Sequence, residues 1–113
     1  MLIPNFLNIR FAIQGIITGM RTEAHIFWLA VSAVVMFAIA VYFGITKMEA
    51  VILILFFVLT IAFEAVNTSI EGISDMVQPV YDKRIRKIKD IASGTVLLIG
   101  ITAFGIWVLF VFF

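Results

Sequence analysis

Cysteine is absent from this 113-residue chain, which excludes disulfide bonds, thiol catalysis and thiolate metal sites. A single histidine, His25, leaves no second imidazole to complete a zinc site, and we expect this side chain at a membrane interface. Charged residues are also scarce, at 13%, whereas 64% of the residues are hydrophobic. Soluble domains contain about 25% charged and about 45–50% apolar residues, so the composition indicates a membrane protein.

Long apolar runs occupy most of the chain. No internal repeat or low-complexity linker divides it, so we expect a single domain over residues 1–113. The runs at 25–44, 50–70 and 91–113 each have about the twenty residues that are needed to cross about 30 Å of hydrocarbon. They predict three transmembrane helices.

Residues 4–22 differ from these runs because their polar and apolar side chains fall on opposite sides of a helix that Pro4 and Asn5 would start. The polar side carries Arg10, Gln14, Thr18 and Arg21, and the apolar side carries Phe6, Ile9, Ile13, Ile17 and Met20. The segment predicts an amphipathic helix that lies in the membrane interface or caps the rest of the protein. The predicted fold class is therefore an all-α integral membrane protein, with one amphipathic surface helix and three transmembrane helices.

Basic residues are distributed unevenly about the predicted spans. Lys47 alone lies in the turn between the first two spans. The other seven of the eight basic residues are Arg10, Arg21, Lys83, Arg84, Arg86, Lys87 and Lys89. They lie before the first span or in the polar segment 76–89, which predicts a loop after Gln78-Pro79 ends the second span. The positive-inside rule places the amino terminus and this loop in the cytoplasm, and the carboxyl terminus outside.

Polar residues recur at helical spacing near the end of the second span. They are Glu64, Asn67, Thr68, Glu71 and Asp75, and in a helix they fall within roughly a 100° arc. A charged side chain at the middle of a membrane helix costs about 2.5 to 3.5 kcal/mol on insertion scales, so such a stripe usually faces a protein interior or an aqueous pocket. We interpret the stripe as a functional site.

The predicted depths of the charged residues indicate what this site could do. Five of them fall near the cytoplasmic boundary, namely Glu23, Glu71, Asp75, Lys89 and Asp90, and Glu64 lies roughly 9 Å deeper. Carboxylates without thiols or paired imidazoles favour a hard ion such as Mg²⁺. A cation and a lysine could hold phosphates, and a deeper carboxylate could deprotonate an alcohol. The arrangement suggests phosphoryl transfer to a hydroxyl presented from the bilayer.

Two motifs, Glu64-x-x-Asn67-Thr-x-Ile-Glu71-x-x-x-Asp75 and Lys89-Asp90-x-Ala92-Ser93-Gly94, resemble those of the prokaryotic diacylglycerol kinase family, which includes undecaprenol kinases. The resemblance covers nearly the whole chain. It implies a homotrimer in the bacterial cytoplasmic (inner) membrane, with active sites shared between subunits. It also implies that Mg²⁺ and ATP bind from the cytoplasm, that the acceptor is a lipid hydroxyl of diacylglycerol or undecaprenol, and that no nucleic acid is bound.

The same resemblance implies a role for each site residue. Glu64 looks like the catalytic base, Asn67 like a residue that orients the reacting groups, and Glu23 and Glu71 like the metal ligands. Together with the two metal ligands, five further residues look like the family's nucleotide-binding residues, namely Asp75, Tyr81, Asp82, Lys89 and Asp90. Glu64 and Ser93 resemble residues that bind the lipid substrate.

Some positions depart from the family pattern. Val80 and Asp82 replace an acidic residue and a histidine often expected in the nucleotide loop, and Pro4 and Phe11 replace a basic residue and a tyrosine of some members. After Glu23 the chain reads Ala-His-Ile-Phe and lacks the Arg-Asn-Phe pattern of many undecaprenol kinase-like members. The nucleotide preference and the choice of lipid alcohol therefore stay open.

Two functions of other classes also fit parts of the sequence. A small proton-coupled drug or metabolite exporter would carry one membrane-embedded glutamate, but it would have four spans and would need neither Glu71 nor the Lys89-Asp90 pair. An assembly subunit would use the polar stripe only to hold helices together.

Overall fold

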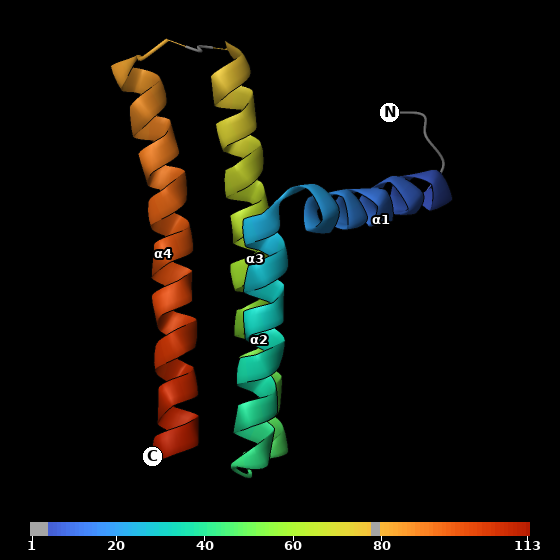
Figure 1. Cartoon of the computed structure of the whole chain (residues 1–113), viewed down its shortest axis with the longest axis vertical. Coiled ribbons are helices and arrows are strands. Elements are labelled where there is room, and N and C mark those ends of the chain that lie inside the picture. The colour runs from blue at the N-terminus through green and yellow to red at the C-terminus, as the bar shows by residue number, and fades with distance from the viewer. Residues whose placement is uncertain (1–4, 78–79) are drawn as a thin grey trace.

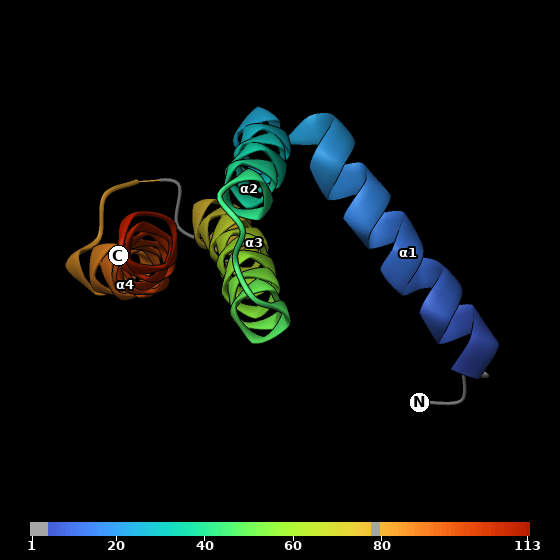
Figure 2. The same ribbon diagram turned by 90° about the horizontal axis from the view of Figure 1, so that it is seen from below.

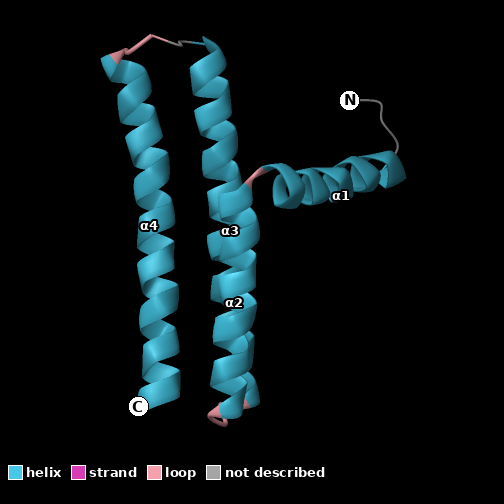
Figure 3. Ribbon diagram, in the orientation of Figure 1, coloured by secondary structure: helices cyan, strands magenta, loops and turns pink. Residues whose placement is uncertain are grey.

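The computed structural model describes residues 5–77 and 80–113, and this part of the chain is almost entirely helical (Figure 3). The helices are α1 (Asn5–Thr22), α2 (Ala24–Tyr42), α3 (Lys47–Val77) and α4 (Lys83–Phe112). Figure 1 shows α2, α3 and α4 standing side by side, while α1 projects sideways from the start of α2. Three of the described helices, α2 to α4, are long and apolar enough to cross a membrane. The predicted all-α architecture is confirmed.

Helix α1 extends away from the other helices in both views (Figures 1 and 2). Its contact with α2 lies close to the joint, where a side chain at Gly19 would meet Ile26. Side chains of the apolar side of α1 are exposed, including Ile9, Ile13 and Ile17. An amphipathic helix with an uncovered apolar side suits the membrane interface better than the alternative of a cap on the bundle.

The spanning helices differ in length from the prediction, most of all at the connection between α3 and α4. A loop over 76–89 is wrong, because α3 continues to Val77 and α4 begins at Lys83. The Asp82 carboxylate caps α4 by accepting a hydrogen bond from the Arg84 backbone N–H at 2.8 Å. Two predicted helix boundaries, the start at Pro4 and the end at Gln78-Pro79, fall outside the described residues. Loss of apolar character ends a membrane span, but a capped helix continues into water.

Two reciprocal hydrogen bonds between Thr46 and Glu49 cap the N-terminus of α3. The Thr46 N–H donates to Glu49 Oε1 at 2.8 Å, and the Glu49 N–H donates to Thr46 Oγ1 at 3.2 Å. This capping box satisfies two N–H groups that the first turn of a helix leaves unpaired. Gly44 has a φ of 84°, which a residue with a side chain rarely adopts, and it turns the chain from α2 into α3.

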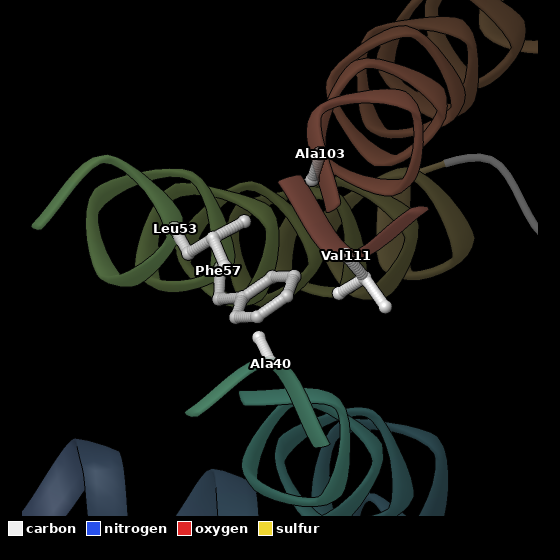
Figure 4. Packing of buried hydrophobic residues seen from close by; sticks show 5 residues of the cluster. All are labelled: Ala40, Leu53, Phe57, Ala103 and Val111. Atoms are coloured by element: carbon white, nitrogen blue, oxygen red, sulfur yellow. The ribbon is translucent and has the colours of Figure 1, made fainter. Parts of the chain in front are cut away.

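The buried apolar core is small and lies where α2, α3 and α4 meet near the α2–α3 turn. Its members are Ala40, Leu53, Phe57, Ala103 and Val111 (Figure 4). The Trp107 indole N–H also donates to the Met36 carbonyl oxygen at 2.8 Å and joins α4 to α2. Most large apolar side chains on the three helices are exposed, as expected for surfaces that lipid or other subunits cover.

Candidate active site

The polar stripe of α3 is held together by hydrogen bonds along the helix. Asn67 Nδ2 donates to Glu71 Oε1 at 3.3 Å, and Thr68 Oγ1 donates to the Glu64 carbonyl oxygen at 2.9 Å. Asn67 is only 7% exposed, and its Oδ1 atom has no hydrogen-bond partner among the described residues. A buried carbonyl oxygen without a partner is costly, which makes this atom a candidate acceptor in the site.

A second cluster lies where α1 meets α2. Glu23 is the N-cap residue of α2, but its side chain makes no capping hydrogen bond. The imidazole of His25 lies between Glu23 and α3, with Nδ1 at 3.9 Å from Glu23 Oε2 and Nε2 at 3.5 Å from Glu64 Oε1. Nε2 is also 2.9 Å from Thr68 Oγ1. His25 therefore links the two acidic residues at the level of Glu64.

This linkage corrects the predicted depth of Glu23. The sequence placed Glu23 level with Glu71, whereas its contact through His25 places it beside Glu64 and Thr68. Glu71 lies seven residues after Glu64, or about 10 Å further along α3. The difference arises because α3 runs straight on for about nine residues beyond Thr68, past the point at which α2 begins.

Four of the predicted nucleotide-binding residues meet where α3 ends and α4 begins. Lys89 Nζ and Asp75 Oδ1 are 3.0 Å apart and join the two helices across their connection. Tyr81 and Asp82 line the same hollow, whose volume is about 110 Å³. The hollow is further lined by Val80, Ile85 and Arg86. It therefore combines cationic, anionic and aromatic groups at the most polar end of the bundle.

Asp82 and Asp90 each pair with an arginine of α4, and neither Asp90 nor Ser93 lines the hollow. Asp82 pairs with Arg84 at 3.2 Å, and Asp90 pairs with Arg86 at 3.1 Å, so each carboxylate already has a cationic partner on α4. Hydrogen bonds from the Arg84 side chain and backbone lower the pKa of Asp82 below its ordinary value. Ser93 is exposed on α4.

Apolar grooves flank the polar stripe on two sides. Glu64 lies in an open groove of about 400 Å³, and Asn67 lies in another of about 390 Å³. The Glu64 groove is lined by Leu29, Thr60, Val96, Leu97, Gly100, Ile101 and Phe104, and the Asn67 groove by Phe63, Val66, Ile70, Ile88, Ile91, Ala92 and Thr95. A polar group at the wall of an apolar groove suits a ligand with a hydroxyl head and a hydrocarbon chain.

Oxygen atoms dominate the donor groups of the site. Within residues 5–77 and 80–113, no cluster of three or more His, Asp or Glu side chains is arranged to hold a metal ion. Glu71 and the unpartnered Asn67 Oδ1 instead provide carboxylate and amide oxygens one helical turn apart. This donor set fits a hard cation that keeps water or phosphate oxygens as its other ligands, as Mg²⁺ does.

A comparison with protein families distinguishes a kinase from an exporter or an assembly subunit. A family model described as prokaryotic diacylglycerol kinase matches residues 10–111. The chain belongs to the prokaryotic diacylglycerol kinase family. It is accordingly a multi-pass membrane lipid kinase that uses ATP, and the exporter and assembly-subunit hypotheses are set aside. The comparison with curated proteins gives no match.

His25 is the residue of this kinase site that the sequence did not indicate. The sequence predicts an interfacial side chain at this position, and the structure adds contacts with groups on α3 that lie about forty residues later in the chain. No local spacing signals such a contact, because it depends on how α2 packs against α3.

Proposed function

We propose that this kinase transfers the γ-phosphate of ATP to the hydroxyl group of a membrane lipid alcohol, either diacylglycerol or undecaprenol, at the cytoplasmic interface. One observation carries the proposal, namely the order of groups along α3. Glu64 lies beside an apolar groove, Asn67 and Glu71 follow within two turns, and Asp75 binds Lys89 at the polar end. A lipid alcohol arriving from the membrane and a nucleotide arriving from water would meet between them.

In this proposal Glu64 is the general base, because it is the acidic residue of α3 that lies against the hydrocarbon side. Asn67 orients the reacting groups, and its buried Oδ1 has no other hydrogen-bond partner among the described residues. Glu71 holds Mg²⁺ and is oriented by its hydrogen bond from Asn67. Glu23, which lies about 10 Å away at the level of Glu64, is assigned to the same ion on the strength of the family resemblance alone. When bound, Mg²⁺ would offset the negative charge on the transferring phosphate.

The polar hollow is the proposed nucleotide site. Lys89 would attract the phosphates, with Asp75 holding its ammonium group in place, and Tyr81 would offer an aromatic surface. Asp82 and Asp90 would contribute from its edge while each stays paired with an arginine. Ser93, one turn after Lys89 toward the membrane, is proposed to contact the lipid head on the strength of the motif.

A homotrimer with shared sites completes the proposal. The single chain leaves many large apolar side chains of α2, α3 and α4 exposed, such as Val34, Leu55 and Leu98. Neighbouring subunits could cover part of this surface and bring further groups to each site.

Loss of the Lys89 charge should weaken nucleotide binding. Hydrogen bonds to charged groups contribute about 1.5–3 kcal/mol, so Lys89→Gln should raise the KM for ATP by about 10- to 100-fold. Lys87→Gln is the matched control, because Lys87 is exposed on the same helix and does not line the hollow. Equal KM values for the two variants, measured with lipid in excess, would remove Lys89 from the nucleotide site.

The topology can be tested by the accessibility of tags. The distribution of basic residues predicts that a tag after Phe113 is reached from outside the cytoplasmic membrane and that a tag before Met1 is not. Protease treatment of intact spheroplasts measures both. Tags on the same side would contradict three membrane crossings.

Purified kinase offered a panel of lipid alcohols tests the proposed reaction. Diacylglycerol, undecaprenol and a shorter polyprenol should be compared at equal surface concentration in the same detergent, with MgATP in excess. We expect one of the first two to be phosphorylated with a much larger kcat/KM than the others. If none of the panel is phosphorylated, the proposed acceptor is wrong.

A further inference from the structure

The imidazole of His25 contacts the proposed catalytic base from a different helix. Its Nε2 atom is 2.9 Å from Thr68 Oγ1 and 3.5 Å from Glu64 Oε1. The Glu64 side chain is 21% exposed and that of His25 is 51% exposed, so the contact lies at the rim of the helix bundle. It joins the first turn of α2 to the polar stripe of α3.

The hydroxyl of Thr68 lies within hydrogen-bond distance of both His25 and the backbone of Glu64. A threonine hydroxyl has a single hydrogen to donate, and Thr68 donates it to the Glu64 carbonyl oxygen at 2.9 Å. When the Thr68 hydrogen points to that carbonyl, Oγ1 accepts from His25 and Nε2 carries the proton. Nε2 also lies 3.5 Å from Glu64 Oε1, a distance typical of a charge pair rather than of a hydrogen bond.

We infer that His25 is a positioning residue for Glu64. Its imidazole, with Nε2 at 3.5 Å from Oε1, keeps the carboxylate in place and leaves Oε2 to accept the proton of the lipid hydroxyl. Thr68 fixes the imidazole by bonding to Nε2 on one side and to the backbone of Glu64 on the other. This inference rests on the proposed function of Glu64 as general base.

A positioning role differs from a purely structural role in its kinetic signature. A carboxylate that is no longer held by its neighbour spends less time in the reactive geometry, which lowers kcat and leaves binding of ATP and lipid unchanged. We expect removal of the His25 contact with Glu64 to lower kcat about tenfold, as is typical for the loss of a polar contact with a charged group. A purely structural role would lower the yield of folded protein and leave the rate per folded molecule unchanged.

The test is a double-mutant cycle in detergent micelles, with rates normalised to folded protein. His25→Ala should lower kcat for lipid phosphorylation about tenfold at unchanged KM for ATP and lipid. His25→Gln, which keeps an N–H donor, should recover part of the rate. Ser69→Ala is the control, because the Ser69 hydroxyl bonds only within α3, to the Ala65 carbonyl oxygen, and is exposed.

The Glu64→Gln background separates the two claims. If His25 acts through Glu64, adding His25→Ala to Glu64→Gln should lower kcat no further. A full additional tenfold loss would overturn the inference while leaving the base assignment intact, and so would an unchanged kcat in His25→Ala alone. A Glu64→Gln variant that keeps the full rate would instead overturn the proposed function of Glu64.

Discussion

Glu64→Gln is expected to slow lipid phosphorylation by about a hundred- to ten-thousand-fold, the usual contribution of a general base. Glutamine keeps the size of the side chain and its hydrogen-bonding ability but cannot accept a proton. Glu64 lies about 10 Å from Glu71 along α3 and about 16 Å from Asp75, so nucleotide binding at the polar end should survive. The affinity for MgATP, measured by fluorescence competition on the same preparation, should stay within about twofold of the parent.

Glu49→Gln is the matched control for this variant. Glu49 lies at the opposite end of the same helix, and glutamine can replace glutamate in its capping box with Thr46. Its rate should equal that of the parent. If Glu64→Gln lost nucleotide affinity in proportion to its rate, Glu64 would be a nucleotide-binding or packing residue and the base would lie elsewhere.

Glu71→Gln should produce the second large effect, a loss of magnesium-dependent turnover by about two or more orders of magnitude. Glu71 carries the charge of the proposed cation site, and Asn67 Nδ2 holds it in place at 3.3 Å. Raising the magnesium concentration should restore part of the Glu71→Gln rate and none of the Glu64→Gln rate, because the first variant lacks a ligand and the second lacks a base. Glu23→Gln should show a smaller loss of the same kind.

Magnesium titrations of the three variants measure this difference. If Glu71→Gln kept its rate at ordinary magnesium concentration while remaining folded, the carboxylate would serve only to bind Asn67. A Glu23→Gln variant whose rate responds to magnesium like the parent would remove Glu23 from the cation site and leave it as a partner of His25.

Helix number and type could be predicted from the sequence because apolar runs of membrane length leave few alternatives. The helix ends could not. The residues from Lys83 to Lys89 are mostly polar and were assigned to a loop, but the Asp82 cap and the Arg86–Asp90 pair one turn apart stabilise them as a helix. Hydropathy reports where the membrane ends, which is a different place from the end of α3 or α4.

The sequence could predict those contacts of the site that form within one helix or between two helices joined by a short connection. The helical period of about 100° per residue places Asn67 and Glu71 on one face of α3. The short connection between α3 and α4 brings Asp75 close to Lys89. The depth of Glu23 and the contact of His25 with Glu64 could not be predicted, because both depend on the register of α2 against α3. That register follows from packing around residues such as Ala40 and Phe57, which no local pattern reveals.

The stoichiometry of phosphate transfer tests the account most directly. Purified kinase with γ-labelled MgATP and its preferred lipid alcohol should form one labelled lipid phosphate for each ADP released, and Glu64→Gln should lower both products together. ADP release without labelled lipid, or lipid labelling that does not depend on Glu64, would contradict transfer to a hydroxyl activated by this carboxylate.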